Sequence, residues 1–146
     1  MARRPRSGPT GLACSGSTAG APRNTIEGHL IGVLAGYVSL VLFGLTDQPA
    51  TIIEGVSASR VMAAALSLGL TSGVMVVLGR AHPPAGATTL IVSLGFLREP
   101  WQLVVLMLAV VLMVAQGFAI NRLAGLPYPL WAPAATAPRG EGARSA

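Results

Sequence analysis

The residues best suited to chemistry in this chain gather in one short stretch between two long apolar segments. A histidine and two prolines stand at its start, followed by small residues and hydroxyls. Two prolines in succession stop a helix, because proline lacks a backbone N–H and has a fixed φ. We expect a break at His82 and a new helix beginning near Pro84. The candidate ligand-binding residues of the stretch are Arg80, His82, Gly86, Ala87, Thr88, Thr89 and Ser93.

The break has the layout of a small anion site. The first N–H groups of a helix have no partner inside it and lie at its positive end. We expect Arg80 to attract an anion, and His82 and the N–H groups of residues 85–87 to receive it. The hydroxyls that would continue the path are those of Thr88, Thr89 and Ser93. The plainer alternative is a rigid turn, in which His82 caps a helix and Arg80 anchors the chain at the headgroups.

The composition indicates a membrane protein. Apolar residues make up 52% and charged residues 10% of the 146 residues, whereas soluble proteins have roughly 25% charged residues. All basic residues are arginines, and they form no stripe with aromatic residues between them, which argues against nucleic-acid binding. The single cysteine, Cys14, excludes a disulfide or a cysteine-based zinc site within one chain.

Four apolar segments predict the fold. Segments 26–45, 61–79 and 101–120 are each long enough to cross a hydrocarbon layer of about 30 Å as a helix. Segment 85–97 would span only about 20 Å, so it is either a thin, tilted span or a re-entrant half-helix. We therefore predict an all-α, polytopic transmembrane helix bundle, with three long helices and one short or half helix after the break.

The chain divides into one membrane domain and two tails. We expect the membrane domain at residues 25–131, after a disordered basic tail at 1–24 and before a disordered tail at 132–146. The loop at 46–59 contains Ile52 and Ile53, which fit a short turn at the membrane interface.

Small residues recur every four positions in the first two segments, so each segment has one small-residue face. Such faces let two helices approach closely, and we expect these two to pack against each other. Arg60 and Arg80 bracket the second segment and are expected to extend to the two membrane interfaces. The small-residue faces consist of Gly28, Gly32 and Gly36, and of Ala65, Gly69 and Gly73.

The arginines predict an orientation. Four arginines precede the first segment and none lies in the loop at 46–59, so the N-terminus is expected in the cytoplasm. Four crossings put the C-terminal arginines there too, whereas a re-entrant third segment would put them outside. We expect both termini in the cytoplasm and the protein in a bacterial inner or plasma membrane. In this topology Arg23, Asn24 and His29 share a membrane face with Arg80 and His82.

Metal and enzymatic chemistry are weaker alternatives. Glu27, His29 and His82 could form a transition-metal site, but Glu27 and His29 do not face the same side of a helix. The sequence contains no HExxH motif, glycine-rich nucleotide loop or nucleophile elbow. We expect no metal, no cofactor and no enzymatic activity.

The stretch His82-Pro83-Pro84-Ala85-Gly86-Ala87-Thr88 resembles the signature of the HPP family of integral membrane proteins. Three further stretches are similar to segments of that family, and the resemblance covers about residues 22–131. It implies a small membrane protein of about four helices, and some relatives are associated with nitrite transport. The three stretches are Pro22-Arg23-Asn24 with Gly28-His29-Leu30, then Ala63-Ala64-Ala65 through Gly69 and on to Arg80-Ala81 before the motif, and Tyr128-Pro129 with Trp131.

The chain departs from the family pattern twice. Glu27 stands where relatives usually have a small residue, which places an acid beside the expected anion mouth. Residues 1–21 are polar where relatives usually have a hydrophobic hairpin, which implies a homo-oligomer or a partner that supplies the missing contacts. Besides the lipid bilayer, we expect nitrite or another small anion as a partner. The alternative is a non-transporting structural or regulatory membrane subunit, or a truncated family member.

Overall fold

The structure is a computed structural model that describes residues 21–80 and 82–125. Within them it contains five helices and no strand. Three of the helices, α1, α3 and α5, are long and apolar enough to cross a membrane. The predicted all-α bundle, with three long helices and a short one after the break, is confirmed. The helices are α1 (Pro22–Leu42), α2 (Thr51–Glu54), α3 (Ala58–Val77), α4 (Ala85–Ser93) and α5 (Pro100–Leu123).

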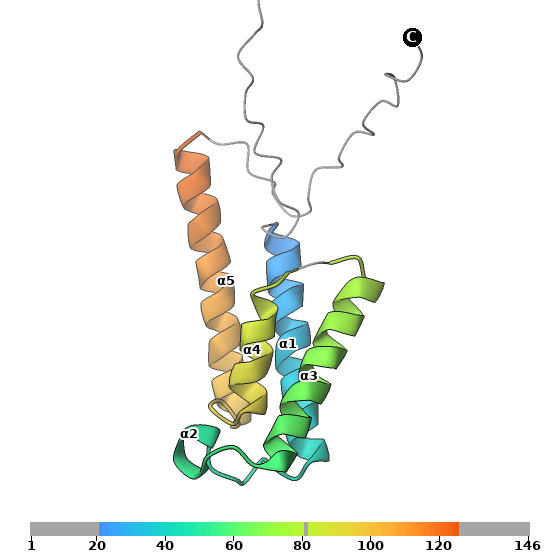
Figure 1. The fold of residues 1–146 in the computed structure, drawn as a ribbon. Coiled ribbons are helices and arrows are strands. Elements are labelled where there is room, and N and C mark those ends of the chain that lie inside the picture. The colour runs from blue at the N-terminus through green and yellow to red at the C-terminus, as the bar shows by residue number, and fades with distance from the viewer. Residues whose placement is uncertain (1–20, 81, 126–146) are drawn as a thin grey trace, which may run out of the picture.

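The helices pass back and forth between two ends of the bundle (Figure 1). The start of α1, the end of α3 and the end of α5 lie together at one end, which we name the break end. The other end contains α2, and we name it the α2 end. α1 runs from the break end to the α2 end, α3 returns, α4 runs toward the α2 end, and α5 returns again.

α4 and the non-helical segment before it connect the two ends. The last turn of α4 reaches the α2 end, where the carbonyl oxygen of Leu94 accepts hydrogen bonds from the N–H and the hydroxyl of Thr51, at 3.1 and 3.0 Å. The chain therefore crosses the bundle here instead of turning back as a re-entrant half-helix. α4 is shorter than the expected segment 85–97, because Gly95 takes a φ of 84° and ends it.

The helix starts follow local chemistry. α1 begins with Pro22 in its first turn, where the missing N–H of proline costs nothing. Residues 22–24 are thus helical, and the prediction that they belong to a disordered tail is wrong. The hydroxyl of Ser57 accepts a hydrogen bond from the N–H of Arg60 and caps α3, while Glu99 and Gln102 form a capping box at α5.

The glycine face of α1 lies in close contact with the break and α4. A Cβ built on Gly28 would lie 2.8 Å from Cβ of His82. One on Gly32 would lie 2.8 Å from the carbonyl oxygen of Ala85, and one on Gly36 would lie 2.8 Å from Cβ of Val92. The three glycines therefore form a groove that admits the broken chain, and the pairs show that α1 and α4 run parallel.

The prediction that the small-residue faces of α1 and α3 pack against each other is wrong. Ala65, Gly69 and Gly73 are exposed, and a Cβ on either glycine would meet nothing within 4 Å. α3 instead turns Ala63, Ser67 and Thr71 inward. Ala65, Gly69 and Gly73 each follow one of these inward residues by two positions, which is about 200° around a helix. The small-residue face of α3 therefore points outward.

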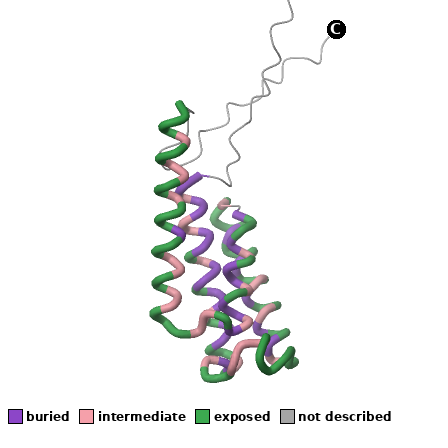
Figure 2. Tube along the Cα trace, turned by 90° about the vertical axis from the view of Figure 1, so that its left-hand side faces the viewer, coloured by how far each residue is buried: buried purple, intermediate pink, exposed green. Residues whose placement is uncertain are grey.

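α5 is the most exposed of the long helices. Val110 is its only buried residue, and it packs mainly on α1. Figure 2 shows the contrast, since α1 is largely purple and α5 largely green. The interior of the bundle is therefore built by α1, α3 and α4.

Candidate functional site

Polar side chains are buried along the contact between α1, α3 and α4. The large exposed side chains of the three long helices are mainly apolar. A buried polar group is costly unless it is hydrogen-bonded, so a bundle with a polar interior and an apolar surface has its chemistry inside. The buried polar residues of these elements and of the break are Asn24, Thr25, His29, Ser39, Arg60, Ser67, Thr71, His82, Thr88, Thr89 and Ser93.

Two imidazoles meet at the centre of this interior. His29 on α1 is 8% exposed and His82 in the break is 6% exposed. Their Nε2 atoms lie 3.3 Å apart, and Nδ1 of His29 lies 2.6 Å from the hydroxyl oxygen of Thr88. The ring centroids are 5.1 Å apart at an interplanar angle of 64°. Gly28 permits this contact, because a side chain at position 28 would overlap the side chain of His82.

The histidine pair can hold its protons in two arrangements. A neutral imidazole has one N–H and one bare nitrogen, so the Nε2–Nε2 contact is a hydrogen bond only if one of the two nitrogens carries a proton. If Nε2 of His82 carries the proton, it donates to the bare Nε2 of His29, whose own proton is then on Nδ1 and is donated to Thr88. If Nε2 of His29 carries the proton, it donates to Nε2 of His82, and the bare Nδ1 of His29 accepts a hydrogen bond from the hydroxyl of Thr88. The chain of three groups can therefore reverse its direction, which is what a proton relay requires.

A second hydroxyl pair links α3 to α4. The hydroxyls of Thr71 and Thr89 lie 2.9 Å apart. Thr89 donates to the carbonyl oxygen of Ala85 at 3.0 Å, so Thr71 is the donor in the pair. Thr71 was not among the predicted site residues. The signal was available, because Ser67 and Thr71 stand four apart and place two hydroxyls on one helix face.

The backbone N–H groups after Pro84 are not free to receive an anion. Those of Ala85, Gly86 and Ala87 donate to the carbonyl oxygens of His82, Pro83 and Pro84, at 3.0, 3.0 and 3.1 Å. The expectation that they form an anion cradle is therefore wrong. The reason is local, since the tight turn at the two prolines brings each carbonyl within reach of the N–H three residues later. Ala87 is also exposed, away from the histidines.

Arg80 is not a free cation either. Its guanidinium forms an ion pair with Glu27, whose other carboxylate oxygen lies 3.2 Å from Nε of Arg23. Glu27 thus engages the guanidinium with which Arg80 was expected to attract an anion, so Arg80 is not the free cation predicted at this mouth. The same contacts occupy Glu27, so it does not join the two histidines as a metal ligand. No group of three or more metal-ligating side chains occurs in the described residues.

The remaining predicted residues divide between the site and its surroundings. Asn24 is buried in the first turn of α1. Ser93 is fully buried near the C-terminal end of α4, far along the helix from the histidines, and its hydroxyl lies 3.5 Å from the carbonyl oxygen of Leu90. Tyr128 and Trp131, which are similar to family residues, lie outside the described residues.

Arg60, expected to extend to the membrane interface, is buried instead. It is 3% exposed, and its Nη2 donates to the carbonyl oxygens of Gln48 and Pro49 at 3.1 and 2.6 Å. A Cβ on Gly95 would lie 2.7 Å from its Nη1. Arg60 therefore ties the loop after α1 to the C-terminal end of α4, where the helix dipole favours a cation.

Comparison with protein families gave one match. The family model described as HPP, transmembrane region, matches residues 12–129, which is more than half of the chain. No curated protein and no solved structure matches the chain.

Proposed function

This chain belongs to the HPP family of integral membrane proteins, and from that premise we propose that it moves a small anion, such as nitrite, across the bilayer together with a proton. Contact with the lipid bilayer follows from the family and from the three long apolar helices. The transported anion and the coupling to a proton are the proposal. The observation that carries it is the contact between the buried imidazoles of His29 and His82.

The charge of the site depends on protonation. Arg80 and Arg23 both pair with the one carboxylate of Glu27, so both guanidiniums are already engaged and the three groups together carry one net positive charge. The neutral histidine pair holds two protons, and a third would give it one positive charge, shared between two rings. A buried cation without a counter-ion is costly, so the third proton and an anion stabilise each other in the site. Binding of the anion is thereby linked to binding of a proton.

Hydroxyl groups extend the site into the bundle. Thr88 contacts His29, and Thr89, the next residue of α4, pairs with Thr71. Each hydroxyl oxygen retains a lone pair and its proton can reorient, so the groups can bind either a passing anion or a proton. The wall of α1 at this level consists of glycines, so its backbone lies directly against the break and α4, and Gly32 lies beside the hydroxyl of Thr89.

The proposed orientation has both termini in the cytoplasm. The described part of the chain has three arginines and one acid at the break end, and two arginines and three acids at the α2 end. An excess of arginine marks the cytoplasmic side. Cysteines placed at Arg23 and Asp47 and labelled in intact cells with an impermeant maleimide test this, with labelling expected only at residue 47. The charged residues are Arg23, Glu27, Arg80 and Arg122 at the break end, and Asp47, Glu54, Arg60, Arg98 and Glu99 at the α2 end.

Uptake of nitrite by proteoliposomes, with a pH dye inside, tests the transport proposal. With an acidic exterior, the parent chain is expected to carry nitrite and protons inward together, above the leak of neutral nitrous acid measured in empty liposomes. His29→Gln and His82→Gln keep hydrogen-bonding groups but cannot be protonated. A barrier increase of only about 1.4 kcal/mol slows a step tenfold, so we expect each variant to lose about tenfold or more of the rate.

Gln116→Leu is the matched control, because Gln116 is an exposed polar residue of α5 that takes no part in the histidine contacts. It is expected to transport like the parent. Uptake that survives both histidine substitutions would refute the proposal, and so would nitrite uptake without proton movement.

The second candidate function is a structural or regulatory membrane subunit that transports nothing by itself and has no enzymatic activity. The observation that favours it is the exposed face of Ala65, Gly69 and Gly73, whose small residues suit a second helix from another chain. Well-inserted parent protein that takes up no nitrite, but that crosslinks through this face, would support it.

A further inference from the structure

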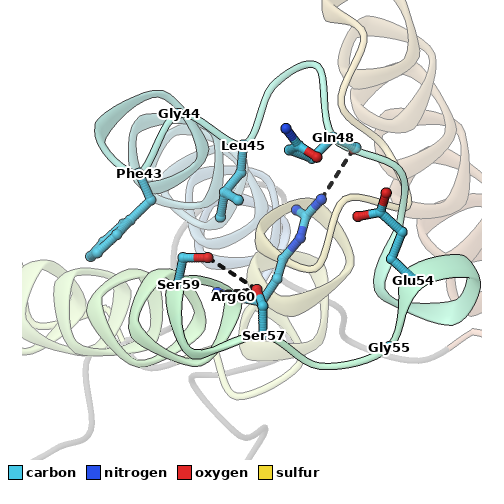
Figure 3. A pocket seen from close by; sticks show the side chains of 9 residues that line it. All are labelled: Phe43, Gly44, Leu45, Gln48, Glu54, Gly55, Ser57, Ser59 and Arg60. Carbon is cyan, nitrogen blue, oxygen red and sulfur yellow. Dashed lines mark hydrogen bonds between the residues drawn. The ribbon is translucent and has the colours of Figure 1, made fainter.

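The α2 end contains a polar pocket, at the opposite end of the bundle from the start of α1. Its volume is about 390 Å³, and the start of α3 forms one wall. Figure 3 shows the guanidinium of Arg60 and the carboxylate of Glu54 projecting toward the same hollow from different elements. The polar side chains that line the pocket are those of Gln48, Glu54, Ser57, Ser59 and Arg60.

Arg60 is the unusual member of this lining. Its Nη2 has two carbonyl acceptors, but its buried Nη1 has no hydrogen-bond partner among the described residues. A buried donor without an acceptor costs about 1–3 kcal/mol, and more on a charged group. Glu54 lines the same pocket but forms no ion pair with Arg60 in the described part of the chain. Arg60 therefore lines the pocket as a buried cation that has no carboxylate partner there, with Nη1 lying beside Gly95.

The start of α3 adds further donors to the pocket. α3 is a 20-residue helix whose first N–H groups have no partner within it. That of Arg60 donates to the hydroxyl of Ser57, the residue before the helix. The hydroxyls of Ser57 and Ser59 lie 3.0 Å apart beside them. Arg98 donates to the same carbonyl oxygen of Gln48 as Arg60, which brings a second positive charge close. Helix N–H groups, hydroxyls and a guanidinium together are the donors that bind a phosphate group.

The surface beside the pocket carries large exposed apolar side chains. Ile52 and Ile53 of α2, and Val56 after it, are 77%, 75% and 72% exposed. Three exposed apolar side chains beside a polar pocket fit a segment that lies in the membrane interface. We propose that this pocket binds the phosphate group of an anionic phospholipid, between Arg60 and the N-terminus of α3. This inference is independent of transport.

Binding of short-chain phosphatidylglycerol to the full chain in a neutral detergent tests the proposal, with diacylglycerol of the same chains and inorganic phosphate as comparisons. Thermal stability is followed against ligand concentration. We expect phosphatidylglycerol to protect the protein at concentrations at least about tenfold lower than either comparison, a difference of about 1.4 kcal/mol. Arg60→Gln is expected to abolish this difference.

Glu54→Gln keeps the proposal testable if Arg60→Gln fails to fold. It removes the one carboxylate of the lining, so the phospholipid is expected to bind roughly two- to fivefold more tightly, the range for an exposed charge pair. Asp47→Asn removes the same charge from the same loop outside the pocket and is expected to leave binding unchanged. Equal effects of the two substitutions would overturn the site. Equal protection by inorganic phosphate would overturn its assignment to a lipid, and equal protection by diacylglycerol would overturn the role of the phosphate.

Discussion

Two faces of small residues with the same four-residue spacing have opposite environments in this molecule. On α1, Gly28, Gly32 and Gly36 lie against the break and α4, so closely that a Cβ would overlap their neighbours. On α3, Gly69 and Gly73 have open space. The spacing permits close approach in both helices, but it does not choose the partner. The partner is chosen by hydrogen bonds, because His82 and Thr89 must meet His29 and Thr71 inside the bundle.

The largest difference in stability between the two small-residue faces is expected on substitution of Gly32. Gly32→Leu places a side chain where the carbonyl oxygen of Ala85 and the hydroxyl of Thr89 already lie. Overpacking costs typically 1–3 kcal/mol, and here rigid backbone is the neighbour, so we expect about 3 kcal/mol or more. The apparent melting temperature in detergent is the measurement. Gly69→Leu is the control with the same change on α3, and equal losses in the two variants would contradict the packing described.

Gly28→Ala is expected to have the next largest effect, and a more local one. Its new methyl group would lie 2.8 Å from Cβ of His82, so the imidazole moves or α1 and the break separate, at roughly 1–2 kcal/mol. Nitrogen NMR of labelled histidines reports whether the Nε2–Nε2 contact survives. Spectra identical to those of the parent would mean that His82 does not rest on Gly28.

Thr71→Val removes the donor that α3 contributes to α4. The lost hydrogen bond to Thr89 costs about 0.5–1.5 kcal/mol in unfolding free energy. Ser72→Ala, one residue further along α3 and exposed, is the control and should leave the unfolding free energy unchanged. Unfolding in denaturant distinguishes the two. If both variants behave like the parent, the α3–α4 contact does not depend on this pair.

The smallest effect is expected at Gly73, where the sign of the change is informative. On an open helix face, Gly73→Ala should be neutral or stabilise α3 by up to about 1 kcal/mol. The same variant would destabilise the protein if a second copy covers this face in the membrane. Thermal stability and crosslinking, measured together at low and high protein density in liposomes, separate a bare face from one covered by a homo-oligomer.

The sequence predicts where helices break and which faces allow close contact. It does not predict which side chains and helices, far apart in the chain, meet in the fold. The two prolines predict the break, and the glycine spacing predicts a close helix contact. The engagement of the N–H groups of Gly86 and Ala87 depends on the dihedral angles of one turn, which composition does not reveal. The ion pair between Arg80 and Glu27 depends on how three helices are rotated, and so does the meeting of the glycine face of α1 with α4 and not with the small-residue face of α3. That rotation follows from hydroxyls such as Thr71, whose role emerges only when α4 lies beside it.

The shortness of α4 has a consequence for how this protein is made. A nine-residue helix is too short to span lipid on its own, since a spanning helix needs about 20 apolar residues. α1 and α3 are synthesised earlier and can be in the membrane before α4 leaves the ribosome. We therefore expect biogenesis to be ordered, with the glycine groove of α1 acting as a receptor for the nascent α4 and the insertion machinery releasing the chain only after that docking.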